Sequence, residues 1–196
     1  MLVKDFMTPE PKTVSPGDDA GSTLELMRSL NFRQCPVVEN GNLVGIVTDR
    51  NLRTALAAGG NPVVRDIMAA NPVTILDYAS IEGAAEIIRS GKFNALPVVN
   101  NRNELVGILT VTDLLDALLK MMGFHEKPVR LEVRMQDETN LFDILHAIQQ
   151  NSEKVLSFSA APEDRKHYYF WVVKCNFGEL EKALRKDNIQ ISTVVS

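Results

Sequence analysis

An internal repeat constrains this chain more than any other feature of its sequence. Segment 107–115 (GILTVTDLL) matches segment 45–52 (GIVTDRNL), about sixty residues earlier. Three further pairs of segments keep the same spacing, apart from one extra residue in the turn at 100–104. These are 3–7 (VKDFM) with 64–68 (VRDIM), 11–14 (PKTV) with 72–75 (PVTI), and 36–38 with 97–99 (both PVV). A repeat of this length predicts that the first two thirds of the chain fold as two copies of one unit.

Each copy is predicted to contain a short apolar strand that leads into a helix. Residues 105–109 form an apolar run with one glycine, which is typical of a strand covered on both faces. Thr110, Thr112 and Asp113 then open a helix, as hydroxyl and carboxylate residues often do. The apolar face of that helix is expected to contain Leu114, Leu115, Leu118, Leu119 and Met122.

Hydrophobic patterns and turn residues predict the other elements of both copies. The first copy should contain strands at 12–14, 34–38 and 43–47, a helix after Asp18 or Asp19, a hairpin turn at 39–42, and a helix at 51–58. The second copy should contain strands at 73–75, 95–99 and 105–109, and helices at 80–90 and 113–122, the last ended by Gly123.

The shared pattern runs D-x-M, then Pro-x-Thr, an amphipathic helix, Pro-Val-Val, and finally G-h-h-T-x-x-D. This order resembles a tandem pair of CBS domains, a Bateman module, over residues 1–122. The resemblance implies one α/β domain at 1–62 and a second at 63–123, packed face to face around a pseudo-two-fold axis. It also implies that the cleft between them binds an adenosine-containing ligand.

The turn at 110–113 allows two interpretations. Thr-x-x-Asp before an apolar helical run matches a capping box. The same turn suits a nucleotide, because Gly107 permits a close approach and a helix N-terminus attracts phosphate. A threonine hydroxyl can donate to that phosphate, and the Asp113 carboxylate can accept from both ribose hydroxyls. In CBS domains the positions of Thr110 and Asp113 do this work, which favours the nucleotide interpretation.

The resemblance also implies where the adenine and a second ligand bind. Backbone groups near the preceding strands would hold the adenine, at Thr74, Ala95, Leu96 and Pro97. The first copy keeps Thr48 but has Asn51 in place of the aspartate. Asparagine offers one acceptor oxygen and no charge. We therefore expect two inequivalent sites, of which the site at Asp113 binds more tightly.

Cations for a phosphate come mainly from the first copy. Arg33 and Arg50 stand where basic residues of CBS pairs often reach phosphates, although solvated arginine is the common alternative. The second copy has Asn94 and Thr112 at these positions. This distribution favours a mono- or diphosphate over a longer polyphosphate.

After residue 128 the pattern changes to that of a different domain. Strands are predicted at 129–135, 154–160, 167–174 and 189–195, with helices at 141–150 and 177–186. The order β-α-β-β-α-β is that of a ferredoxin-like split. Residues 128–196 therefore resemble an ACT domain, and a CBS pair followed by such a domain resembles the acetoin-utilisation B (AcuB) family of regulators.

The ACT-like segment lacks the usual effector signature. Its first strand-to-helix turn, 135–141, contains no glycine and has two acidic residues, which would repel the carboxylate of an amino acid. Dimerisation through the sheet is the favoured role. The outward half of the aromatic strand 168–171 could serve such an interface.

Composition narrows the class of function. The net charge is −4 and no basic run exists, so nucleic-acid binding is not expected. No apolar run reaches the length of roughly 18 residues that spans a membrane, and the N-terminus lacks the regions of a signal peptide. We therefore expect a cytoplasmic protein, in which Cys35 and Cys175 are buried free thiols.

No catalytic or metal-binding pattern stands out. The three histidines, His125, His146 and His167, are scattered without a partner acid, cysteine or serine. The chain is thus predicted to be a regulator with no required cofactor and no metal. AMP, ADP, ATP, NAD or S-adenosylmethionine would bind between the copies, and a homodimer or an unidentified regulated protein would respond. The alternative is a ligand-free scaffold whose function is dimerisation, which Asn51 favours and Asp113 opposes.

Overall fold

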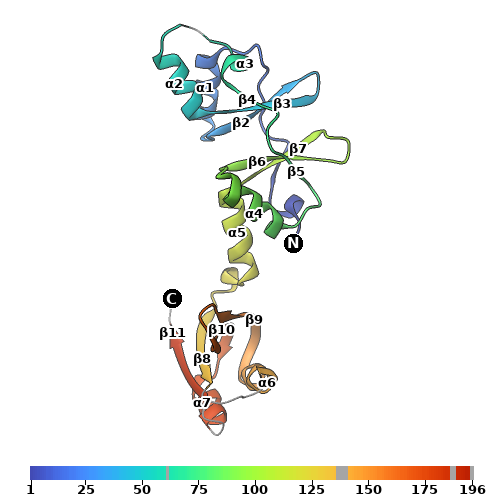
Figure 1. Ribbon diagram of the computed structural model, residues 1–196. Coiled ribbons are helices and arrows are strands. Elements are labelled where there is room, and N and C mark those ends of the chain that lie inside the picture. Colours follow the sequence, from blue (N-terminus) through green and yellow to red (C-terminus); the bar gives the residue numbers. More distant parts are fainter. Residues whose placement is uncertain (61, 136–140, 186–188, 195–196) are drawn as a thin grey trace. The chain divides into compact units, whose positions relative to one another are not determined.

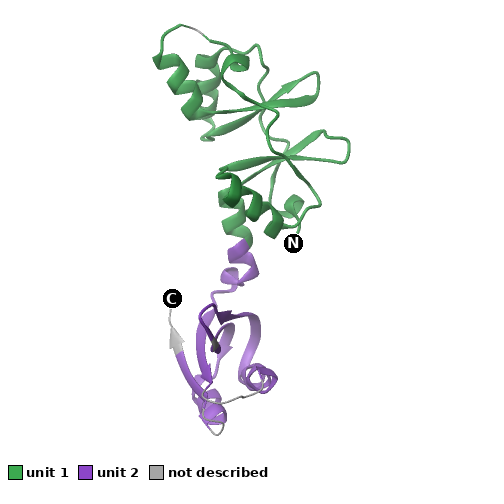
Figure 2. Ribbon diagram, in the orientation of Figure 1, with its two compact units in different colours: residues 1–117 green, residues 118–196 purple. Residues whose placement is uncertain are grey.

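The computed structural model describes residues 1–196 apart from 61, 136–140, 186–188 and 195–196. Two compact units make up the chain, Met1–Ala117 and Leu118–Ser196 (Figure 2). The first unit contains two apolar cores and the second contains one.

The first unit contains the two sequence copies as two similar assemblies of strands and helices (Figure 1). The first copy has α1 (Ala20–Ser29), β2 (Gln34–Glu39), β3 (Asn42–Thr48) and α2 (Asp49–Ala57). The second copy has β5 (Ile75–Leu76), α4 (Ile81–Gly91), β6 (Ala95–Val99), β7 (Leu105–Thr110) and α5 (Val111–Met121), which from Leu118 on belongs to the second unit. Side chains of Asp19 and Ser80 begin α1 and α4 by accepting hydrogen bonds from backbone N–H groups at 2.7 and 3.1 Å.

Each copy is completed by the segment that leads into the other copy. Strand β1 (Thr8–Pro9) pairs with β7, and β4 (Ala69–Ala70) pairs with β3, which gives the sheets β1-β7-β6-β5 and β2-β3-β4. The 3-10 helix Val3–Asp5 places Val3 in the core of the second copy. Helix α3 (Val64–Ile67) places Val64 in the core of the first. The two copies therefore exchange their leading segments.

The exchange explains the methionine and the glycine that both copies share. A Cβ atom at Gly45 would lie 2.5 Å from Sδ of Met68, and one at Gly107 would overlap Sδ of Met7. A side chain at either glycine would force the methionine opposite it to shift, and it would also lie close to the backbone carbonyl of Ala69 or Thr8, at 3.2 and 3.1 Å. The close approach that the sequence suggested at Gly107 is thus made by Met7.

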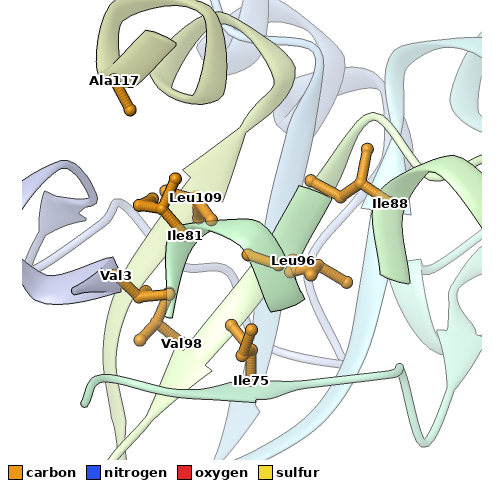
Figure 3. Packing of buried hydrophobic residues seen from close by; sticks show 9 residues of the cluster. Val3, Ile75, Ile81, Ile88, Leu96, Val98, Leu109 and Ala117 are labelled. Atoms are coloured by element: carbon orange, nitrogen blue, oxygen red, sulfur yellow. The ribbon is translucent and has the colours of Figure 1, made fainter. Parts of the chain in front are cut away.

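The two cores of the first unit are built from equivalent positions. Figure 3 shows the core of the second copy, which contains Val3, Ile75, Ile81, Ala84, Ile88, Leu96, Val98, Leu109 and Ala117. The core of the first copy contains Val14, Ala20, Leu24, Met27, Cys35, Val37, Val47, Leu52 and Val64. Val3 and Leu109 in one core match Val64 and Val47 in the other, so the symmetry of the sequence is also a symmetry of packing.

One expectation about burial is wrong, and the apolar face of α5 lies only partly against the core. Strand β7 is not covered on both faces, because burial alternates along it and only Gly107 and Leu109 are buried. Helix α5 directs Ala117 into the core, whereas Leu115 and Leu118 are 54% and 49% exposed. A helix advances about 100° per residue, so the row through Ala117 and the row through Leu118 face different surroundings.

Two predicted strands are shorter than expected. The strand at 12–14 is reduced to a single bridge between Val14 and Val37. The strand at 73–75 begins only at Ile75, because β5 pairs with β6 through Ile75 and Leu76 alone. Both segments still run alongside a neighbouring strand, but with fewer ladder hydrogen bonds.

The second unit is a four-stranded antiparallel sheet with two helices on one face. Its elements are β8 (Val129–Met135), α6 (Leu141–Asn151), β9 (Ser152–Ala161), β10 (Asp164–Cys175), α7 (Phe177–Arg185) and β11 (Ile189–Val194). The strand order is β11-β8-β10-β9. Residues of both helices share one core with the sheet, including Ile144, Ile148, Leu180, Leu184, Leu131 and Phe170. The predicted turn at 135–141 falls largely outside the described residues.

The other face of this sheet carries an ionic and aromatic cluster. Glu132 accepts a hydrogen bond from Arg134 at 3.0 Å and lies 2.9 Å from Nε2 of His167. The hydrogen bond from Arg134, aided by His167, lowers the pKa of Glu132. His167 and Trp171 are buried, and Tyr169 between them is half-buried. The outward half of this strand is therefore not the open aromatic surface that the sequence suggested for an interface.

Candidate functional site

A hollow of about 1380 Å³ lies in the first unit and is lined by both copies. Pockets for single small ligands usually measure roughly 300–1,000 Å³, so this one has room to spare. Its first-copy lining consists of Thr8, Glu10, Pro11, Lys12, Leu30, Asn31, Phe32, Arg33, Gln34, Pro36, Thr48, Asp49, Arg50, Asn51 and Arg53. Its second-copy lining consists of Asn94, Ala95, Ile108, Thr110, Val111 and Thr112. The hollow thus joins the strand-to-helix turns of both copies.

The two turns have related but unequal hydrogen bonds. Oγ1 of Thr48 accepts from the N–H of Asn51 at 3.1 Å, and Oγ1 of Thr110 accepts from the N–H of Asp113 at 3.3 Å. In the second turn a side chain also returns these hydrogen bonds, because Oδ2 of Asp113 accepts from the N–H and the hydroxyl of Thr110 at 2.6 and 2.8 Å. The described structure has no such return bond from Asn51 to Thr48. The second copy therefore has a complete capping box and the first copy has half of one.

Capping leaves part of the Asp113 carboxylate available. Both of its side-chain hydrogen bonds use Oδ2, and Oδ1 has no partner in the part of the chain that the structure describes. An ionised carboxylate can accept about four hydrogen bonds. The same side chain can therefore cap α5 and accept from a ligand.

The segments before β2 and β6 are held against these turns by backbone hydrogen bonds. The N–H of Asp49 donates to the carbonyl of Arg33 at 3.0 Å, and the N–H of Val111 donates to the carbonyl of Asn94 at 3.1 Å. Arg33 is thereby fixed beside the helix start that carries Arg50. The equivalent place in the second copy presents the neutral side chain of Asn94.

The charges in the hollow are unevenly distributed. Arg53 is paired with Asp49 at 2.7 Å. Lys12, Arg33 and Arg50 make no side-chain ion pair with any residue that the structure describes, and all three are exposed. Glu10 is the lining carboxylate left over once Asp49 is paired. The hollow therefore offers an excess of positive charge within a chain whose net charge is −4.

The structure separates the ten residues that the sequence nominated into two groups. Six of them line the hollow, namely Arg33, Thr48, Arg50, Asn51, Ala95 and Thr110. Four do not line it, namely Thr74, Leu96, Pro97 and Asp113. Leu96 and Pro97 are buried in β6. Asp113 remains next to the hollow through its bonds to Thr110.

Sequence reasoning missed several residues of the lining. Lys12 stands in the quoted repeat segment 11–14, where the matching residue is Val73, so the mismatch in charge was a usable signal. Arg53 lies one helical turn after Asp49, a spacing that predicts an ion pair. Phe32 has no such signal, because its place depends on how the turn after α1 folds.

Both cysteine thiols have raised pKa values. Cys35 is buried, and burial together with the nearby charge of Asp18 raises the pKa of its thiol to about 12. Its Sγ donates to the carbonyl of Lys12 at 3.3 Å. A thiol of this kind stays protonated near neutral pH and is a poor nucleophile. Cys175 is only half-buried, contrary to expectation, and burial raises its pKa as well.

In the described part of the chain, no group of three or more His, Cys, Asp or Glu residues is arranged to hold a metal ion. None of the described helices is both long enough and apolar enough to cross a membrane.

Comparison with known proteins defines the family. The CBS domain family matches residues 3–58 and 64–120, which together exceed half of the chain. The chain therefore belongs to the CBS domain family and contains two tandem CBS domains. The exchanged leading segments, the two T-x-x-[ND] turns and the hollow all lie within this matched region.

Three solved structures are similar to the chain. CBSX2 from Arabidopsis thaliana in complex with AMP is 32% identical, with a TM-score of 0.55 over 61% of this chain and 96% of that one. The CBS pair of MJ0100 with 5′-methylthioadenosine and S-adenosyl-L-methionine is 26% identical, with a TM-score of 0.56 over 60% and 95%. A candidate acetoin utilization protein (AcuB) of Vibrio cholerae is 27% identical, with a TM-score of 0.58 over 64% and 96%.

Proposed function

We propose that this protein is a non-enzymatic sensor that binds an adenosyl ligand in the hollow between its two CBS domains. The hollow itself carries the proposal, because it brings the strand-to-helix turns of both copies together with unpaired cations. Similar CBS pairs hold AMP, S-adenosylmethionine and methylthioadenosine, which supports this class of ligand.

The tighter position is assigned to the second copy. Thr110 and the N-terminus of α5 meet the 5′ end of the ligand, and Asp113 accepts from the ribose through its remaining lone pairs. Backbone groups at Ala95, Leu96 and Pro97, with those near Thr74, hold the adenine. The turn that contains Thr48 and Asn51 forms a second, weaker position, because Asn51 carries no charge.

A thermal-shift screen tests this proposal. The full chain is heated with AMP, ADP, ATP, NAD and S-adenosylmethionine in turn. A ligand at about 100 times its Kd should stabilise the folded state by about 2.7 kcal/mol, which is several degrees. Loss of the shift in Asp113→Ala supports the sensor. If no compound shifts a preparation shown by mass spectrometry to be free of nucleotide, the alternative of a ligand-free scaffold takes its place.

We propose that the second unit is a ferredoxin-like, ACT-like domain at 128–196 which follows CBS domains at 1–62 and 63–123. Its strand order, β11-β8-β10-β9, and its two helices on one face support this assignment. The combination resembles AcuB, and the V. cholerae structure supports the resemblance for the CBS pair. In this proposal the ligand signal passes to the second unit or to a regulated protein. The two unpaired cysteines suit the reducing cytoplasm.

We also propose that the protein is a homodimer, and α5 provides the supporting observation. Its residues Val111, Leu115, Leu118 and Met121 are exposed although they are large and apolar. The fold does not require this, because α2 has Asp49 and Arg53, joined as an ion pair, at the positions of Val111 and Leu115. Exposed apolar rows of this kind commonly mark contact surfaces.

Sedimentation velocity on the full chain tests the dimer. Leu115→Glu should convert the dimer to a monomer, whereas Thr54→Glu, an equal charge change on the exposed face of α2, should not. A wild-type protein that sediments as a monomer at all concentrations removes the proposal.

A further inference from the structure

The cations that line the hollow belong to one copy only. Lys12, Arg33 and Arg50 all come from the first copy. The matching residues of the second copy are Val73, Asn94 and Thr112, all of them neutral. Since the two copies share one fold, the fold does not demand positive charge at these places. The positive charge is therefore a property of the first copy alone, and it lines the hollow.

These cations have no internal partner to occupy them. Arg53 forms an ion pair with Asp49 at 2.7 Å. Lys12, Arg33 and Arg50 form no ion pair with the residues that the structure describes. Three unpaired positive charges face one unpaired carboxylate, that of Glu10. Like charges that line a concave surface concentrate a field that attracts anions and repels cations.

Solved CBS pairs similar to this chain hold adenosyl ligands of opposite charge at the 5′ position. One similar CBS pair holds AMP, whose 5′ group is an anionic phosphate, and another holds S-adenosylmethionine, whose 5′ group is a cationic sulfonium. We infer that this protein selects its adenosyl ligand by charge, accepting a 5′ phosphate and rejecting a 5′ sulfonium. In this inference the second copy holds the adenosine, and Lys12, Arg33 and Arg50 of the first copy meet the 5′ group across the hollow. The inference rests on the proposed function.

The position of the cations fits a ligand whose adenosine contacts the second copy and whose 5′ group contacts the first. Thr110 and Ala95 of the second copy line the same hollow as Arg33 and Arg50. The backbone of Arg33 is fixed to the start of α2 by the hydrogen bond from Asp49, so its side chain departs from a defined point. Charge-assisted hydrogen bonds from arginine to phosphate are stronger than neutral ones. A ligand held in this way has contacts with both copies.

Isothermal titration calorimetry on the full chain tests the inference with three probes, AMP, adenosine and S-adenosylmethionine. Wild type should bind AMP at least about 10-fold more tightly than adenosine and S-adenosylmethionine more weakly than adenosine, since hydrogen bonds to charged groups are the stronger ones. Arg33→Gln and Arg50→Gln should each weaken AMP about 5-fold and leave adenosine within two-fold, the modest factor reflecting their exposure. Affinity for S-adenosylmethionine should hold or rise.

A matched control separates local from global charge. Arg102→Gln removes the same charge from an exposed turn that does not line the hollow, so its AMP-to-adenosine ratio should equal that of wild type. Equal or tighter binding of S-adenosylmethionine than AMP overturns the inference while leaving the sensor intact. So does a variant that weakens AMP and adenosine alike. If none of the three probes binds wild type, the proposed function itself fails, and the inference fails with it.

Discussion

Replacing Asp113 should change both the stability of the protein and its affinity for an adenosyl ligand. Oδ2 accepts two short hydrogen bonds from Thr110, at 2.6 and 2.8 Å, and these close the capping box of α5. Asp113 is the N3 residue of that box, and losing a hydrogen bond of this kind costs about 0.5–1.5 kcal/mol. Asp113→Ala should therefore lower the free energy of unfolding by about 1 kcal/mol and Tm by about 4 °C without ligand.

The effect on affinity should be larger than the effect on stability. In the proposed function Asp113 accepts ribose hydroxyls with the lone pairs that capping leaves unused. A hydrogen bond to a charged group contributes about 1.5–3 kcal/mol, which corresponds to a rise in Kd of about 10- to 150-fold. Asp113→Asn keeps one acceptor oxygen for Thr110, so it should retain much of the stability while still losing affinity.

Two assays and one matched variant separate these roles. Differential scanning calorimetry measures the cap, and calorimetric titration with AMP measures the ligand contact. The control is Asn51→Ala, at the equivalent position of the first copy, where the side chain returns no hydrogen bond to Thr48 in the described structure. A lower Tm with unchanged Kd in Asp113→Ala would leave Asp113 as a cap alone. The predicted inequivalence of the two sites is refuted if Asp113→Ala weakens AMP no more than Asn51→Ala does.

Three further predictions follow from packing and from shifted pKa values. Gly107→Ala should lower the free energy of unfolding, measured in urea, by about 1–3 kcal/mol, because the new Cβ overlaps Met7. The double change Gly107→Ala with Met7→Ala should cost less than the sum of the two single changes. Strictly additive losses of stability would contradict the contact. The pKa of Cys35 is raised from 9.0 to about 12, so the free energy of unfolding should fall as pH rises between these values. The fall should be about 1.4 kcal/mol per pH unit relative to Cys35→Val. If wild type and Cys35→Val show the same dependence of stability on pH, the raised pKa is refuted. The hydrogen bond from Arg134 lowers the pKa of Glu132 from 4.5, so its contribution is present above that pH and is lost as pH falls further, and Glu132→Gln should flatten the acid side of the stability curve.

The sequence identified the repeating unit but could not show which copy each leading segment completes. Segments 3–7 and 64–68 have the same pattern, so either would satisfy the groove beside either glycine-containing strand. A local sequence pattern predicts the kind of surface that a segment packs against. It does not predict which of two equivalent surfaces the segment contacts. Only the structure shows that Val3 lies in the core of the second copy and Val64 in the core of the first.

The sequence was more successful at naming the turns of the site than at naming its lining. Thr48, Asn51 and Thr110 could be located because a strand running into a capped helix has a local signature. Lys12 reaches the hollow only because its segment follows β1, which is paired with a strand about a hundred residues away. Long-range pairing of this kind leaves no periodic trace in the chain.

In the proposed function, the exchange of leading segments would give a ligand a direct mechanical route between the copies. Residues 8–12 belong to the first copy in sequence, yet β1 within them is hydrogen-bonded to β7, which ends at Thr110. Lys12 lines the hollow a few residues beyond β1. A phosphate held by Lys12 and Arg33 and an adenosine held at Thr110 would together favour one arrangement of β1 against β7. A ligand shifts a conformational equilibrium only through such a difference in contacts. In the inferred mode of binding only the phosphate reaches the first copy's cations, so we expect the phosphate to switch the protein and adenosine to bind without switching it.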